Sequence, residues 1–375
     1  MSGPQAAARH DASTSRVAEP ATAPRPDFVP ETILVYVGAE LIGDGLLKLP
    51  FLRALRNAFP AARVTWLAGK ARTVFAHELA PLVAGLIDEV IEDAGIGSRY
   101  IEAIGRPLPD RQFDLILDTQ RRVVTTLAVR RIRHRRFISA CAGYVFSDVK
   151  PPGRRALSNH KPPALIDQML ELIALGRTGR TDAPLETGGL PVLPEAVAAE
   201  AARLLPEGGD YVALSPGAGS RNKCWPLDSF EALAGGLIEN GLVPVFALGP
   251  NEQEWYERLR ATVPGAQFPM QEAPAAAEME PLASIAVAAR CLACVANDSG
   301  GGHLLAASNS PLISLFGPTS PAKFAPRVPQ LTVIEAASYG SRDMSAIPVE
   351  AVLAAVMEMA ANQRQATAGT RTRRS

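Results

Sequence analysis

The chain has 375 residues, 47% of them hydrophobic, and a mean hydropathy of +0.07. This length and hydrophobic content suffice for two domains with buried cores. Lys plus Arg and Asp plus Glu number 38 each, so no net charge attracts the whole chain to nucleic acid or to a membrane. No apolar run reaches the length of a transmembrane helix.

The two ends of the chain differ in composition from its middle. Residues 1–30 are rich in Ala, Pro, Ser and Arg and lack the apolar stretch of a signal peptide, which predicts a disordered tail. Residues 363–375 end in several arginines and are predicted to form a second, basic disordered tail. The expected location is the cytoplasm, with peripheral contact at the cytoplasmic face of the inner membrane as an alternative.

The folded region opens with a β–α–β pattern. Residues 33–37 form a predicted strand, 38–45 a glycine-containing loop, 46–59 a helix with one apolar face, and 64–67 the next strand. Asp44 lies in the loop, at the carboxyl end of the first strand, where open α/β sheets bind ligands. The carboxylate is therefore a candidate general base, and a helix-capping Asp is the structural alternative.

Strand and helix patterns alternate along two halves of the chain. Alternation of this kind predicts parallel sheets that are covered on both faces. We expect a first domain at residues 31–180, a linker and a helix at 181–209, and a second domain at 210–362 whose last helix, 348–359, packs back on the first. The predicted strands are 32–38, 63–68, 87–91, 113–118 and 136–140, then 211–215, 243–248, 292–296, 311–316 and 331–335.

A strand-to-turn element begins the second half. The apolar residues 211–215 end in the small residues 216–220, and Lys223 follows. The backbone of a Ser- and Gly-rich loop can hold an anion, and Lys223 can neutralise it as a point charge. An ordinary tight turn with a solvated Lys is the alternative.

The most informative stretch lies at residues 297–303, Asn-Asp-Ser-Gly-Gly-Gly-His, between a predicted buried strand and an Ala- and Leu-rich helix. Unpaired backbone N–H groups and the helix dipole favour a phosphate there, and Ser299 and Gly300 would expose them. Asp298 does not favour phosphate, so it is expected to accept hydrogen bonds from a sugar hydroxyl or from backbone N–H groups. Ordinary helix capping is the alternative.

These blocks together resemble glycosyltransferase family 9, the bacterial heptosyltransferase-like enzymes. The matching residues are Gly43-Asp44 with the Leu-rich segment through Arg53; Pro216–Ser220 with Lys223 and Trp225-Pro226; Gly249-Pro250 with Glu252; and Asn297–His303 with Leu315–Thr319. The resemblance covers residues 31–336. It implies a GT-B fold, with two Rossmann-like doubly wound domains facing a cleft, and inverting transfer of a sugar from a nucleotide donor. The family's lipopolysaccharide enzymes typically use ADP-heptose and the inner core on lipid A.

The resemblance also implies roles for individual residues. Asp44 matches the catalytic base, Lys223 a basic residue at the donor diphosphate, and Asp298 the acidic residue on the donor sugar. His303 matches a family histidine that either holds the loop or contacts the ligand. The full predicted donor site is Ser215, Gly217, Gly219, Ser220, Lys223, Asp298, Ser299, Gly300 and His303.

Two departures from the family pattern concern flexibility and the acceptor. Gly301-Gly302 replaces the usual Pro-Met, which predicts a more flexible loop. Asp118-Thr119-Gln120-Arg121-Arg122 replaces a segment resembling Asp-Leu-Gln-Gly. The predicted acceptor side comprises Gln120, Arg121, Arg122, His160 and Lys161. The arginine-rich segment 121–136 suits an anionic glycolipid, an anionic membrane surface or a solvated helix face.

No cofactor is expected beyond the nucleotide sugar, and no metal site, because the chain has no Asp-x-Asp and its histidines are scattered. Cys291 and Cys294 form a CxxC inside an apolar segment, which indicates ordinary buried thiols in a reducing compartment. No nucleic-acid partner is expected. A transferase or epimerase with a different nucleotide sugar, or a non-catalytic binding subunit of the same fold, are the alternative functions.

Overall fold

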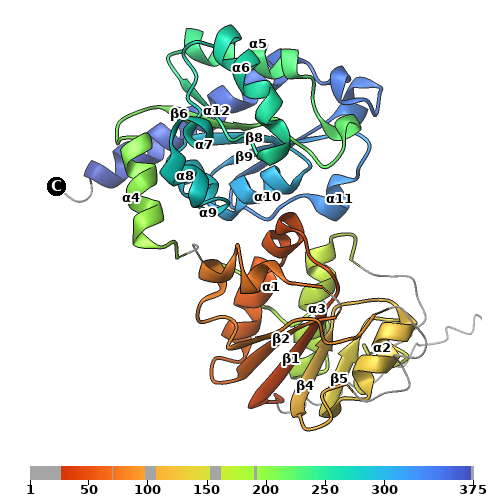
Figure 1. Cartoon of the computed structure of the whole chain (residues 1–375). Helices are drawn as coiled ribbons and strands as arrows, with labels where there is room; N and C mark the ends of the chain where they lie inside the picture. The colour runs from red at the N-terminus through yellow and green to blue at the C-terminus, as the bar shows by residue number, and fades with distance from the viewer. Residues whose placement is uncertain (1–26, 70, 98–106, 153–161, 190–191, 373–375) are drawn as a thin grey trace, which may run out of the picture.

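The computed structural model describes residues 27–69, 71–97, 107–152, 162–189 and 192–372 and contains two parallel five-stranded sheets (Figure 1). The first has the order β3-β2-β1-β4-β5 and the second β10-β9-β8-β6-β7. This confirms the predicted α/β class. The strands are β1 (Thr32–Val37), β2 (Arg63–Ala68), β3 (Glu89–Ile91), β4 (Gln112–Asp118), β5 (Arg133–Ser139), β6 (Tyr211–Ser215), β7 (Val243–Phe246), β8 (Ala293–Asn297), β9 (Leu312–Phe316) and β10 (Leu331–Glu335).

Side chains of the first sheet alternate between two apolar layers, as the pleat of a strand requires. Ile33, Val35 and Val37 of β1 join a core with the helices α1 (Ile42–Ala58) and α3 (Leu165–Thr178), which also pack against each other. Leu34 and Tyr36 face the opposite layer, beside Ala128 and Val129 of α2 (Val123–Arg130). The sheet is therefore covered on both faces.

The second sheet is covered in the same way. One face packs with α4 (Glu195–Leu204), α8 (Pro274–Glu278), α9 (Leu282–Ala288) and α10 (Gly300–Ala307), and the other with α5 (Leu227–Glu239), α6 (Gln253–Thr262) and α12 (Val349–Thr372). The shorter helices are α7 (Pro269–Glu272), α11 (Pro321–Phe324), η1 (Val74–Ala76), η2 (Ala80–Val83), η5 (Arg221–Lys223), η6 (Pro250–Glu252), η7 (Ala336–Tyr339) and η8 (Met344–Ala346).

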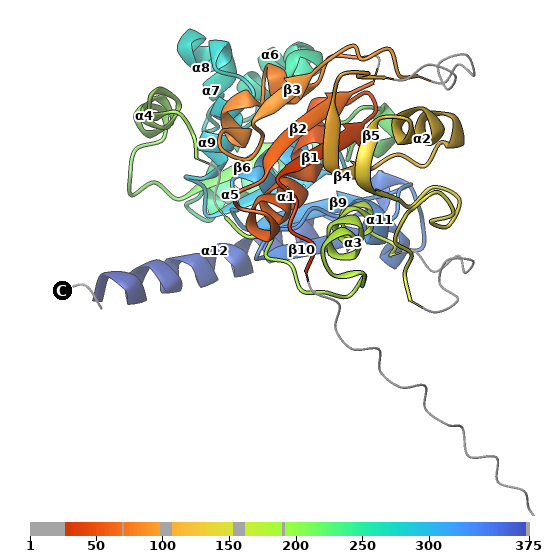
Figure 2. The same cartoon turned by 90° about the horizontal axis from the view of Figure 1, so that it is seen from below.

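The last helix corrects two expectations. It continues to Thr372, so residues 363–372 are helical rather than a disordered tail, and its last turns extend beyond the body of the domain (Figure 2). Arg364 Nη2 lies 2.6 Å from Asp210 Oδ2. The helix packs against α5, β8 and β9 instead of the first domain, because Val352 and Val356 enter the apolar core of the second sheet.

Segment ends also differ from the sequence prediction. The last residues of the predicted N-terminal tail are docked, because Phe28 N donates to Arg177 O at 2.9 Å and Pro30 is buried. Gly176 lies inside α3, where its lack of a side chain lets the helix approach Leu115 of β4. Most of the predicted tail, residues 1–26, lies outside the described residues.

A buried carboxylate ties together the end of the first sheet. Asp118, the last residue of β4, is fully buried. It accepts hydrogen bonds from Thr126 Oγ1 of α2 at 2.6 Å, Ser139 Oγ of β5 at 2.8 Å and Gln120 N at 2.9 Å. Burial raises the pKa of Asp118 to about 6, and the three hydrogen bonds oppose that shift only in part.

Because this pKa is higher in the folded than in the unfolded chain, the contribution of Asp118 to stability is full below pH 4 and declines as pH rises toward 6. The decline amounts to about 3 kcal/mol. We expect the free-energy difference between wild type and Asp118→Asn, from urea unfolding at pH 4 to 7, to shift in favour of the variant as pH rises. Parallel pH profiles for the two proteins would contradict this.

Candidate functional site

The N-terminal ends of α1 and α10 meet where the two domains face each other (Figure 1). A Cβ added to Gly43 would lie 3.0 Å from Gly300 Cα and 3.8 Å from His303 Cδ2. Only glycine therefore allows this approach without displacing backbone. The contact brings the segment around Gly43-Asp44 together with the segment Asn297–His303.

Asp44 is exposed at this junction. It is the third residue of α1, so Gly43 to Gly45 belong to the first helical turn rather than to the predicted loop. Its Oδ2 accepts a long hydrogen bond of 3.4 Å from Leu41 N. The capping alternative is thus partly realised, but the weak bond leaves the carboxylate open to a ligand between the domains.

Lys223 and Asp298 form an ion pair that joins the segment after β6 to the segment after β8. Lys223 Nζ lies 3.0 Å from Asp298 Oδ2, and Thr319 Oγ1 donates to the same oxygen at 2.6 Å. The Asp298 side chain is 8% exposed and that of Lys223 is 30% exposed, so the cation is the accessible member. Thr319, which follows the next strand β9, is a site residue that the sequence did not predict.

Asn297 connects the two loops beneath this pair. Its Nδ2 donates to Pro216 O at 2.7 Å, and its Oδ1 accepts from Trp225 N at 3.0 Å. Asn297 is fully buried, so both bonds are shielded from water. They hold the loop after β6 against the loop after β8, which keeps Lys223 near Asp298.

The glycine run is the first turn of α10 rather than a loop. Ser299 caps the helix by accepting from Gly302 N at 3.2 Å. A Cβ on Gly301 would lie 2.2 Å from Ser215 Oγ, and one on Gly302 would lie 2.6 Å from Asn297 O. Gly302 therefore has no room for a side chain, because Asn297 O belongs to the backbone, whereas a side chain at Gly301 would displace the hydroxyl of the predicted donor residue Ser215.

His303 occupies the space between the charged groups of both domains. Burial lowers the pKa of His303, the carboxylates of Asp298 and Asp44 oppose this, and Lys223 adds to it. The imidazole is therefore neutral at neutral pH. Its Cδ2 is the side-chain atom of the second domain that a Cβ on Gly43 of α1 would approach, at 3.8 Å.

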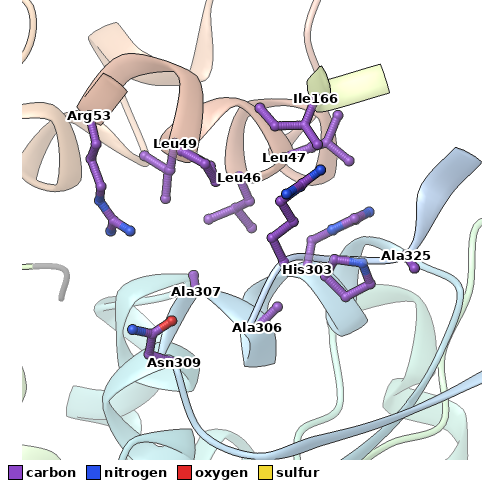
Figure 3. A pocket seen from close by; sticks show the side chains of 13 residues that line it. Leu46, Leu47, Leu49, Arg53, Ile166, His303, Ala306, Ala307, Asn309 and Ala325 are labelled. Atoms are coloured by element: carbon purple, nitrogen blue, oxygen red, sulfur yellow. The ribbon is translucent and has the colours of Figure 1, made fainter. Parts of the chain in front are cut away.

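A pocket between the domains extends from His303 along α1 and α10 (Figure 3). Ion pairing of Arg327 with Asp167 of α3 joins the domains at this pocket. Burial lowers the pKa of Arg53, which also lines it. The lining residues are Leu46, Leu47, Leu49, Pro50, Arg53, Ile166, His303, Ala306, Ala307, Asn309, Ala325, Pro326 and Arg327.

The remaining donor candidates lie in the loop after β6. Gly217 is backed by Glu252, whose Oε1 would lie 2.5 Å from an added Cβ, and Glu252 also accepts from Gly249 N at 3.0 Å. Burial raises the pKa of Glu252. Gly219 has open space beside it, and Ser220 is exposed, with its hydroxyl 2.7 Å from Asn222 Oδ1. These two are the accessible part of the loop.

The acceptor candidates are only partly described. Gln120 lies beside the end of β1, with Oε1 3.1 Å from the position of a Cβ on Gly38. Arg121 and Arg122 are exposed after β4. His160 and Lys161 lie outside the described residues.

The arginine-rich segment is not one patch. Arg121 and Arg122 follow the carboxyl end of β4, whereas Arg133 begins the neighbouring parallel strand β5 and lies beside Gln112, at the amino ends of the strands. Arg130 pairs with Asp148 at 2.6 Å and Arg135 with Asp114 at 3.2 Å. Of the three alternatives for this segment, a single solvated helix face does not apply, because the segment is shared between α2 and β5.

Cys291 and Cys294 are buried and free. Burial raises the pKa of Cys291 and raises that of Cys294 to about 12. The prediction of ordinary buried thiols is confirmed. Among the described residues, no cluster of His, Cys, Asp and Glu is arranged to hold a metal ion.

Solved structures of other proteins share the overall fold of this chain. Escherichia coli ADP-heptose LPS heptosyltransferase II has a similar structure, with a TM-score of 0.65 and 20% identity over 89% of this chain and 99% of that one. The structure of E. coli heptosyltransferase WaaC with ADP has a TM-score of 0.62 and 20% identity, over 88% of this chain and 99% of that one. The structure of a family 9 glycosyltransferase from Veillonella parvula has a TM-score of 0.66 and 18% identity, over 88% of this chain and 97% of that one. At these identities the likeness shows the GT-B fold.

Two sequence comparisons identify the family. Lipooligosaccharide heptosyltransferase 2 of Haemophilus influenzae is 33% identical over 114 residues, which are 30% of this chain and 32% of that protein. The family model described as glycosyltransferase family 9 (heptosyltransferase) matches residues 101–347, well over half of the chain. The chain therefore belongs to glycosyltransferase family 9.

Proposed function

We propose that the chain transfers a sugar, heptose from ADP-heptose, to a hydroxyl of a lipopolysaccharide core or related glycan, with inversion and without a metal. The observation that carries the proposal is the meeting of Asp44 with the α10 N-terminus that bears Asp298 and His303. The WaaC structure with ADP supports an adenine nucleotide donor. The H. influenzae lipooligosaccharide enzyme supports the acceptor class.

Breaking a sugar–diphosphate bond builds positive charge on the anomeric carbon and negative charge on the leaving oxygen. The accessible ammonium of Lys223 and the first-turn N–H groups of α10 are positioned to stabilise the negative charge. As Lys223 turns to the diphosphate, Asp298 becomes available to sugar hydroxyls. Because Lys223 and the helix dipole supply the positive charge, the proposal needs no divalent cation.

Asp44 acts from the other domain in a single displacement. The acceptor oxygen forms a bond to the anomeric carbon as the bond to the diphosphate breaks, and the hydroxyl proton passes to the exposed carboxylate. The Arg327–Asp167 pair and the apolar contact of α1 with α10 hold the domains together. Exclusion of water between them limits hydrolysis of the donor.

The acceptor side of the first domain has a surface suited to an anionic membrane. Val123 and Leu127 are four residues apart on α2, share one helix face, and are 45% and 39% exposed. Arg121 and Arg122 stand immediately before them and are exposed. We propose peripheral contact through this face. Within the described residues, no helix is both long and apolar enough to cross a bilayer.

Thermal melts with nucleoside diphosphates test the donor. ADP is expected to raise the melting temperature with or without EDTA, because it binds the folded state through groups of the protein. Lys223→Met should remove most of the shift, while Lys323→Met, an exposed Lys nearby that makes no described contact with Asp298, should keep it. A shift with UDP or GDP instead of ADP would mean that the donor carries a different base and is not ADP-heptose. No shift with any nucleotide would favour a non-catalytic subunit.

Turnover of Asp44→Asn tests the base. We expect kcat to fall about 100-fold or more, since general-base catalysis contributes that much, with the ADP-induced melting shift unchanged. The matched control is Glu350→Gln, an exposed carboxylate in the first turn of α12. Near-wild-type turnover by Asp44→Asn would rule out this carboxylate as the base.

Flotation with vesicles tests the membrane contact. Vesicles containing phosphatidylglycerol should retain the wild-type protein, and the double variant Val123→Glu/Leu127→Glu should lose that binding because it places charge on the apolar face. Ile238→Glu, at an exposed apolar residue of α5, is the control. If the vesicles retain all three proteins equally, the face of α2 with Val123 and Leu127 does not bind the membrane.

A further inference from the structure

Glu40 is a buried carboxylate that the proposed reaction does not use. It lies between the end of β1 and the start of α1, and its side chain is fully buried. Lys48 pairs with Oε1, while Trp66 Nε1 and Thr73 Oγ1 donate to Oε2 at 3.1 and 2.6 Å. An unpaired carboxylate would cost several kcal/mol to bury, so these three donors are what make this buried position tolerable.

The position of Lys48 connects Glu40 to the proposed base. Lys48 follows Asp44 by four residues on α1, so the two side chains share a helix face about 6 Å apart. Long helical side chains lean toward the N-terminus, which directs Lys48 back over the turn that carries Asp44. Yet the ammonium pairs with Glu40, and the Lys48 side chain is only 12% exposed.

An ammonium bound to Asp44 would compete with the acceptor hydroxyl for the carboxylate oxygens and make the carboxylate a weaker base. Within the described part of the chain, the one hydrogen bond found at the Asp44 carboxylate is the long one from Leu41 N. The other titratable group that approaches it from the second domain, His303, is neutral because burial lowers its pKa. The junction therefore keeps positive charge on the donor side, at Lys223.

We propose that Glu40 is a positioning residue for the transfer: it holds Lys48 away from Asp44 and so keeps that carboxylate free for the acceptor hydroxyl. Its bonds to Trp66 of β2 and to Thr73 anchor the first turn of α1 to the neighbouring strand and loop. Thr73 N in turn donates to Glu92 Oε1 at 2.6 Å, so the loops after β1, β2 and β3 form one support. This inference rests on the proposed role of Asp44 as the base.

The variant Glu40→Gln keeps an oxygen for Trp66 and Thr73 but removes the charge that binds Lys48. We expect kcat to fall about tenfold or more while KM for the donor and the ADP-induced melting shift stay unchanged. Trp66→Phe is the matched control, because it removes one donor to the same carboxylate and leaves the ion pair. Its kcat should stay near wild type even where its melting temperature falls.

The double variant Glu40→Gln/Lys48→Met separates positioning from folding. In this variant no ammonium remains on α1 that could bind Asp44, so kcat should return to within about threefold of wild type even without the charge of Glu40. If Glu40→Gln fails to fold, the double variant still decides, because a neutral pair is tolerated at such a site better than a lone charge. A low kcat in a folded double variant, or a wild-type kcat in Glu40→Gln, would overturn the proposal.

The same assays distinguish the two levels of inference. If Asp44→Asn is inactive and Glu40→Gln is fully active, Asp44 remains the proposed base and Glu40 is not a positioning residue. Active Asp44→Asn would remove the proposed base, and with it the reason for keeping Lys48 away.

Discussion

The close approach of two helix N-termini, at Gly43 of α1 and Gly300 of α10, is the constraint on which the rest of the structure depends. A single Cβ on Gly43 would press to 3.0 Å from the facing backbone. Each N-terminus carries the positive end of a helix dipole, so bringing two together is unfavourable unless negative charge lies near them. Asp44 supplies that charge from α1, and a donor diphosphate is suited to supply it at α10.

The same junction explains how the ionic groups are arranged. Cations near it are paired in the structure: Lys223 with Asp298 and Lys48 with Glu40. Of these two pairs, that of Lys223 is the more accessible, since the Lys223 side chain is 30% exposed, whereas the Glu40 side chain is fully buried. One pair can therefore exchange partners with a ligand, and the other is held by burial and three donors.

Packing beneath α10 accounts for the departure of this chain from its family. A Cβ on Gly302 would lie 2.6 Å from the backbone oxygen Asn297 O, and one on Gly301 would lie 2.2 Å from Ser215 Oγ, which would have to move. A glycine run that suggests flexibility in the sequence is thus a requirement of packing. The buried bonds of Asn297 to the loop after β6 then carry that geometry to Lys223.

Sequence alone determined the alternation of strands and helices and placed Asp44, Lys223 and Asp298 at the carboxyl ends of strands, because hydrophobic periodicity and turn residues are local signals. It did not determine that Asp44 lies inside a helix, that residues 363–372 continue α12, or that the arginine-rich segment is divided by β5. Nor did it assign Glu40 or Thr319. These features depend on contacts between residues far apart in the chain, such as Glu40 with Thr73 and Thr319 with Asp298, and only tertiary packing decides such contacts.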